Sequence, residues 1–272
     1  MSITQPTVPT SRTESEQQKL NTLTKEQLSV YLRLEDYLVE KYGRSDEVPD
    51  DWQLVLDPQC LLRFCRARKF NYDDVLSLVT EWLNWRITRK PHLIKSKDVQ
   101  NELKVGKIFW FGHDKEGCPN VIIKAQLHVV ADRDYDEFIS LVLYTAESLM
   151  NSIKSSGKNI ERYNIIYDAS NIGYKNFDAN ICKDVFKLSN YYAERLNSVY
   201  IINANWILKA LMKVVKPMMD PVTFSKIVAL DSIEDLKTNI DKDQLIEEYG
   251  GSNIYKYTIP CELSLSEQTK SE

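Results

Sequence analysis

The sequence has no surplus of positive charge, although it contains many charged residues. It holds 35 Lys and Arg against 39 Asp and Glu, which gives a formal net charge of −4 at pH 7. Proteins that bind nucleic acid usually carry a basic surplus that neutralises phosphates. We therefore expect no nucleic-acid partner, and any contact with an anionic membrane must depend on a local group of cations.

Long apolar runs are also missing. No stretch of 18 apolar residues is present, so we expect no segment that spans a bilayer. The opening MSITQPTVPT lacks the apolar core of a secretory signal. The five cysteines include no Cys-x-x-Cys pair, which is typical of free thiols in a reducing compartment. We expect a cytoplasmic protein.

No motif of covalent or cofactor chemistry is present. The sequence contains no GxGxxG, no Walker loop and no GxSxG, and its three histidines have no metal-ligand spacing. Cys60 and Arg66 have the Cys-x5-Arg spacing of cysteine phosphatases, but bulky residues of a predicted helix separate them. Helical amides are already hydrogen-bonded and cannot wrap a phosphate. We expect no enzyme, no metal and no cofactor.

The N-terminal third has helical periodicity. The first 20 residues are polar and predict a disordered tail, and residues 21–100 predict a helical lobe. Thr24 and Gln27 form a capping box at the start of one helix, which Gly43 would end. A second helix starts at Asp57-Pro58, and Asn71 caps a third.

The periodicity changes after about residue 105. KIFWFGHDKEGCPNVIIKAQL predicts two strands joined by a turn, and a helix capped by Asp134 follows. Strands then alternate with helices up to residue 249, with the last helices expected over 232–249. This order predicts an α/β fold with a largely parallel sheet over 101–255 and a tail over 256–272.

Two segments carry charges that could bind a ligand. LLRFCRARKF interleaves four cations with apolar residues, and its spacing places Arg63 and Arg66 on one side of a helix. Near two later strand starts, Glu194 and Arg195 stand opposite Thr223 and Lys226. Such a set suits a phosphorylated polyol, because cations hold phosphate while acid and hydroxyl groups bond hydroxyls. Spacing alone leaves two other readings open: a solvated helix face for the first segment, and capping with salt bridges for the second.

These segments resemble a known family. LLRFCRARKFNYDDVLSLVTEWLNWR resembles the N-terminal helical signature of the CRAL-TRIO lipid-binding family, and DKEGCPNVI resembles its hairpin. The string YYAERLNSVYIINANWILKALMKVVKPMMDPVTFSKIVAL, with the later YGG, is similar to the core of its phosphatidylinositol/phosphatidylcholine transfer branch. The resemblance covers roughly residues 24–255 in consistent order.

The resemblance implies a helical lobe and an α/β lobe with a deep pocket for one phospholipid, phosphatidylinositol. The family's headgroup residues fall on Arg68, Lys69, Glu194, Arg195, Thr223 and Lys226. One segment departs from the pattern: Tyr174, Lys175 and Asn176 stand where the transfer branch has small hydroxyl residues that help to hold choline. We therefore expect little transport of phosphatidylcholine.

The family's gate helix aligns with residues 205–219. Trp206 starts an apolar stretch, and Lys209, Lys213 and Lys216 form one basic stripe. Such a helix suits a membrane interface, with lysines near lipid phosphates. A buried helix with a solvated edge fits the pattern equally well.

Three functions fit the sequence. The first is binding of phosphatidylinositol and its transfer between membranes, by a monomer that contacts membranes transiently from the cytoplasm. The second is a carrier of an unphosphorylated ligand such as a sterol or an isoprenoid, which the matched cations disfavour. The third is a lipid-sensing adaptor that acts through a protein partner, for example by presenting lipid to a lipid kinase.

Overall fold

The computed structural model describes residues 14–42 and 57–259, and the chain divides into two compact units, Met1–His92 and Leu93–Glu272. We describe each unit by itself. The division precedes the expected lobe boundary at residue 100, because Val99 and Leu103 are buried in the core of the second unit.

The first unit is helical. It contains α1 (Glu14–Asn21), α2 (Lys25–Tyr42), α4 (Pro58–Ala67) and α5 (Tyr72–Arg89). The capping box holds as predicted: the Gln27 amide donates to the Thr24 hydroxyl at 3.2 Å, and the Thr24 amide donates to the Gln27 side chain at 3.1 Å. The proposed stop at Gly43 lies outside the described residues.

Helix α1 corrects one expectation. Residues 14–20 were predicted to belong to a disordered tail, but they are helical, and Leu20 is buried. One buried leucine in an otherwise polar segment leaves no periodic signal, so composition alone missed this helix. Residues 1–13 lie outside the described part of the chain.

The second unit is built on a five-stranded sheet in the order β1-β2-β3-β4-β5. The hairpin of β1 (Ile108–His113) and β2 (Pro119–Lys124) is antiparallel, and the remaining pairs are parallel. The other strands are β3 (Tyr163–Asp168), β4 (Leu196–Ile202) and β5 (Ile227–Ala229). The predicted α/β class with a largely parallel sheet is therefore confirmed.

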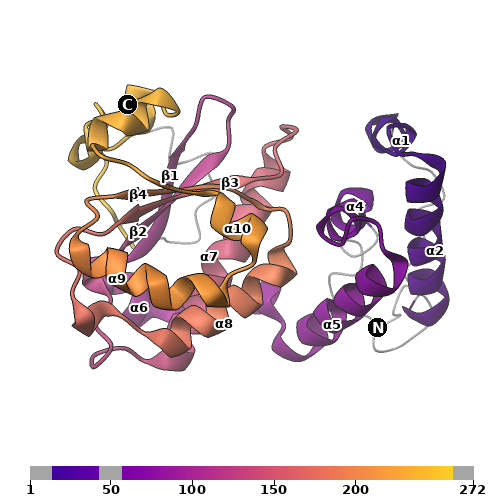
Figure 1. The fold of residues 1–272 in the computed structure, drawn as a ribbon, viewed down its shortest axis with the longest axis horizontal. Coiled ribbons are helices and arrows are strands. Elements are labelled where there is room, and N and C mark those ends of the chain that lie inside the picture. The colour runs from indigo at the N-terminus through magenta and orange to yellow at the C-terminus, as the bar shows by residue number, and fades with distance from the viewer. Residues whose placement is uncertain (1–13, 43–56, 260–272) are drawn as a thin grey trace. The chain divides into compact units, whose positions relative to one another are not determined.

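Helices cover one face of the sheet (Figure 1). They are α6 (Gln100–Val105), α7 (Tyr135–Ser155), α8 (Ala179–Ser189) and α9 (Trp206–Val215). Side chains from α6, α7 and α8 pack with Trp110 and Val121 of the hairpin, and Leu208 of α9 packs with Ile201 of β4. The same face of the sheet therefore carries two separate apolar clusters.

The segment after β5 covers the opposite face. Leu236, Ile240 and Tyr249 pack there against Phe109 and Ile166. Regular helices were expected over 232–249, but this segment forms three short 3-10 turns, Ile233–Thr238, Lys242–Gln244 and Glu247–Tyr249. The expectation was wrong because the segment runs close to the sheet: a side chain at Gly112 of β1 would meet the Gln244 carbonyl oxygen at 2.1 Å.

The expected C-terminal tail is partly ordered. The Tyr257 hydroxyl donates to the Leu103 carbonyl at 2.7 Å, and its ring centre lies 5.0 Å from that of Phe109. The chain therefore still packs on the second unit at a position where sequence composition predicted a tail. Residues 260–272 lie outside the described range.

Candidate functional site

Charged residues gather at the amino edge of the parallel strands. Arg195 directly precedes β4, and Lys226 directly precedes β5. Neighbouring parallel strands start at the same edge of a sheet, and β4 pairs with β5 through Val199 and Ile227. The fold thus brings together two of the sequence-predicted headgroup residues that are 31 positions apart in the printed sequence (226 − 195).

Both cations are held by backbone carbonyls. The Arg195 Nη1 donates to the carbonyl of Glu161 at 2.9 Å. The Lys226 Nζ donates to the carbonyl of Leu196 at 2.7 Å. Each of these bonds orients its cation at the amino edge of the sheet. An ammonium has three N–H donors and a guanidinium has five, so such a group can bond more than one acceptor at once.

Burial and the neighbouring charges set the pKa of Lys226 at this edge. Burial lowers the pKa of the Lys226 ammonium, and the positive charge of Arg162 lowers it further. The carboxylates of Glu194 and Asp220 act in the opposite direction. Glu194 itself has a left-handed backbone with φ 60°, which few non-glycine residues adopt. The fold therefore turns sharply at Glu194, immediately before Arg195 and β4.

Thr223 lies in the short helix α10 (Pro221–Ser225), between α9 and β5. Asp220 caps this helix by accepting from the Thr223 amide at 3.2 Å, and the Thr223 carbonyl accepts from the Lys226 amide at 3.2 Å. The Thr223 side chain is partly exposed. One helical turn therefore fixes Thr223 next to Lys226.

Arg68 and Lys69 belong to the first unit. They follow α4, where Lys69 and Phe70 have φ values of 50° and 59° and reverse the chain. Arg68 is partly exposed and donates to the Ala67 carbonyl at 3.3 Å, whereas Lys69 is exposed. The chain turns at Lys69 and Phe70, and both cations are accessible.

Helix α4 contradicts another expectation. Arg63 and Arg66 were predicted to share one side, but Arg63 is 4% exposed while Arg66 is exposed. Positions three apart still differ by roughly 60° around a helix, which is enough to cross the edge of a buried face. The same helix supports the view that the Cys60 spacing is accidental, because the Cys60 and Leu61 amides both bond to the Asp57 carbonyl.

Helix α9 is buried on one side and exposed on the other. Leu208, Leu211 and Val215 are buried, whereas the predicted basic stripe, Lys209, Lys213 and Lys216, is exposed. Apolar side chains accompany the lysines: Trp206 is 68% exposed, Val214 50% and Met218 40%. A solvated helix edge would carry polar residues, so this mixture is unusual for a surface that meets only water.

The last lysine of the stripe has a specific contact. Lys216 starts the 3-10 turn Lys216–Met218, and its Nζ lies 4.7 Å above the centre of the Phe224 ring in α10. Phe224 is the residue after Thr223. This cation–π contact joins the end of the gate segment to the helix that carries Thr223, a link that the sequence did not reveal.

Apolar side chains of the sheet face α9. Tyr167, Val199 and Ile227 come from β3, β4 and β5, and all three are only partly buried, as is Met212 of α9. Burial raises the pKa of Tyr167, so its hydroxyl has lost much of its hydration although water still reaches the side chain. These residues form a partly accessible apolar surface beside the charged edge.

The loop after β3 has a structural role at its centre. Asn176 is buried, donates to the carbonyls of Gln126 (3.1 Å) and His128 (2.9 Å), and accepts from the Gly173 amide at 2.8 Å. Tyr174 and Lys175 are exposed. Water screens the charge of the exposed Lys175, so this lysine would repel a choline headgroup only weakly, and the missing hydroxyls are the larger departure from the transfer branch.

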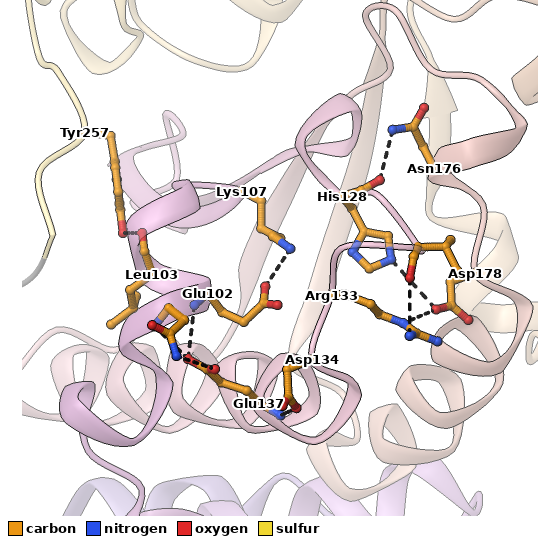
Figure 2. A network of polar contacts seen from close by, with 12 residues as sticks. Glu102, Leu103, Lys107, His128, Arg133, Asp134, Glu137, Asn176, Asp178 and Tyr257 are labelled. Atoms are coloured by element: carbon orange, nitrogen blue, oxygen red, sulfur yellow. Dashed lines mark hydrogen bonds and ion pairs between the residues drawn. The ribbon is translucent and has the colours of Figure 1, made fainter.

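Two groups of polar contacts lie near α6 and α7: Glu102 with Lys107, and His128 and Arg133 with Asp178 (Figure 2). Lys107 and Glu102 form an ion pair of 2.6 Å with side chains only 5% and 6% exposed. Phe138 lies between Lys107 and His128, with its ring centre 5.2 Å from the ammonium and 4.7 Å from the imidazole centre. No sequence motif indicated these contacts, because their members come from separate elements.

We expect His128 to destabilise the fold in acid. Burial, with help from the Lys107 charge, lowers the pKa of the imidazole from 6.5 to about 4. The unfolded chain therefore binds the proton more tightly, so this contribution to stability is complete above pH 6.5 and is lost as the pH falls to 4. The loss is up to roughly 3 kcal/mol. Urea unfolding at several pH values should give a flatter profile for His128→Gln, and an unchanged profile would contradict this role.

Within the described residues, no helix is long and apolar enough to cross a membrane. Over the same ranges, no group of three or more His, Cys, Asp or Glu residues could hold a metal ion.

Two family models match this chain. The CRAL/TRIO domain matches residues 103–251, and the CRAL/TRIO N-terminal domain matches residues 13–81. The chain therefore belongs to the CRAL-TRIO family.

Two relatives and one solved structure show how far the similarity extends. The CRAL-TRIO domain-containing protein C3H8.02 of Schizosaccharomyces pombe is 30% identical over 74% of this chain and 47% of its own length. The phosphatidylinositol transfer protein CSR1 of Eremothecium gossypii is 29% identical over 72% of this chain and 48% of its own length. The match thus spans about half the length of these relatives. The crystal structure of Sfh5 has a TM-score of 0.68 at 18% identity, covering 87% of this chain and 90% of that one.

Proposed function

We propose that this protein binds one molecule of phosphatidylinositol and carries it between membranes. The observation that supports this most is the amino edge of β4 and β5, where Arg195 and Lys226 are oriented by backbone carbonyls beside Glu194 and Thr223. Two cations suit the phosphodiester, while the acid and the hydroxyl suit the inositol hydroxyls. Arg68 and Lys69 of the first unit are the two other cations that the family resemblance assigns to headgroup binding.

The apolar surface beside that edge would hold the acyl chains. Exposing each CH2 to water costs about 0.8 kcal/mol, so two chains of about 16 carbons cost roughly 25 kcal/mol. A carrier must offer them a dry surface and close it in solution. Tyr167, Val199 and Ile227 are partly accessible apolar residues in a suitable place. We propose that α9 closes over them.

The exposed side of α9 would contact the membrane. Trp206 and Val214 could enter the interface while Lys209 and Lys213 remain near lipid phosphates. We propose a monomer that binds membranes transiently from the cytoplasm and does no covalent chemistry. Presentation of the bound lipid to a lipid kinase would use the same site.

Mass spectrometry of lipids that copurify with the protein tests this proposal. We expect inositol phospholipid to be bound and little phosphatidylcholine, because residues 174–176 lack the small hydroxyls of the transfer branch. A transfer assay between vesicles that contain both lipids should show the same preference. Equal rates would contradict the preference, and a bound sterol or isoprenoid without phospholipid would replace the proposal by the second function.

A further inference from the structure

Arg162 is a cation that neither the spacing nor the family resemblance singled out. It directly precedes β3, and each of its two neighbours in the chain forms a hydrogen bond with Arg195. The Glu161 carbonyl accepts from the Arg195 guanidinium at 2.9 Å, and the Tyr163 amide donates to the Arg195 carbonyl at 2.9 Å. Its backbone is therefore fixed against the residue that starts β4, at the same edge of the sheet.

The side chain of Arg162 is available for a ligand. It is exposed, and among residues 14–42 and 57–259 it takes part in no hydrogen bond or ion pair. Its positive charge nevertheless acts on Lys226, because it lowers the pKa of that ammonium. Arg195 and Lys226 each donate to a carbonyl, whereas the guanidinium of Arg162 keeps all its donors.

We propose that Arg162 is a third headgroup cation, and that it makes this site prefer inositol lipids with a phosphate on the ring over unphosphorylated phosphatidylinositol. The inference rests on the proposed function and names the substrate class of the same site. One phosphodiester supplies a single negative charge, which together with the Glu194 carboxylate already balances Arg195 and Lys226. A ring phosphomonoester adds about −1.5 to −2 charges and three acceptor oxygens, which suit a further guanidinium.

Binding of phosphatidylinositol and of a phosphatidylinositol monophosphate in vesicles tests this inference. We expect the wild type to prefer the monophosphate, and Arg162→Gln to lower the ratio of the two affinities roughly tenfold or more. Arg162→Lys should keep part of the preference, because it retains the charge but loses the planar fork. Lys158→Gln removes an exposed cation from the same loop and should keep the wild-type ratio.

A pH profile separates headgroup binding from a loss of structure. Arg162→Gln should raise the pKa of Lys226, because Glu194 and Asp220, the acids that act on that ammonium, remain in place. The alkaline decline of phosphatidylinositol binding should then move to higher pH. A structural defect alone would lower binding at every pH without that shift.

Three results would overturn the inference. The first is that Arg162→Gln leaves the ratio of the two lipid affinities unchanged. The second is that Lys158→Gln lowers this ratio as much as Arg162→Gln does. The third is full competition by inorganic phosphate at concentrations where water-soluble glycerophosphoinositol phosphate competes, which would indicate a general anion site. Failure of the proposed function looks different, because the wild type would then take up neither inositol lipid.

Discussion

Arg195→Ala is expected to weaken phosphatidylinositol binding roughly 10–150-fold, the effect of losing one charge-assisted hydrogen bond of about 1.5–3 kcal/mol. Lys226→Ala should have a smaller effect in the same direction. Arg195 is the more severe change because its guanidinium can hold the Glu161 carbonyl and a phosphate together. Lipid uptake from vesicles measures the loss.

The design must separate binding from folding, because both side chains also bond to backbone carbonyls. Circular dichroism and thermal unfolding should show that both variants are folded. Lys104→Ala provides a matched control, since it removes an exposed cation from α6. Normal uptake by both Arg195→Ala and Lys226→Ala would refute the headgroup assignment.

Reversing the charge of the α9 stripe should slow transfer strongly. A lysine near an anionic membrane contributes about 1 kcal/mol, so losing Lys209 and Lys213 should slow transfer roughly 30-fold, and repulsion by two glutamates should add to this. The amount of lipid already bound should not fall, because the buried side of α9, formed by Leu208, Leu211 and Val215, is unchanged. High salt should reduce the difference between wild type and Lys209→Glu/Lys213→Glu.

Helix α8 offers a matched control for this charge reversal. Lys183 and Lys187 are also exposed and four residues apart, but no large exposed apolar side chain of α8 accompanies them. Lys183→Glu/Lys187→Glu should therefore transfer lipid nearly normally. An equal defect in both pairs would show a general charge effect instead of a membrane-binding helix.

Trp206 can report the contact directly. The side chain is 68% exposed, and insertion among lipids should shift its emission to the blue or expose it to quenchers placed in the bilayer. The chain has five tryptophans, so the other four are first replaced by phenylalanine. If Trp206 does not respond to vesicles, α9 is a structural helix and the membrane contact lies elsewhere.

The sequence determined the local structure where short-range chemistry is strong. Thr24 and Gln27 cap α2 because their side chains reach amides three residues away. Asp134 caps α7 in the same way, and alternating strands and helices require a largely parallel sheet. The sequence also placed Glu194 and Lys226 close to the starts of two strands, and the starts of neighbouring parallel strands lie at one edge of the sheet.

Only the tertiary structure decided the features that depend on neighbours from distant segments. Arg162 joins the charged edge because β3 pairs with β4, and Lys216 reaches Phe224 because the chain turns between α9 and α10. The Lys107–Glu102 pair is buried because α7 covers it, and residues 233–249 form 3-10 turns because they lie against the sheet. Periodicity and spacing report what a segment does by itself, whereas burial and charge depend on what the completed fold places next to it.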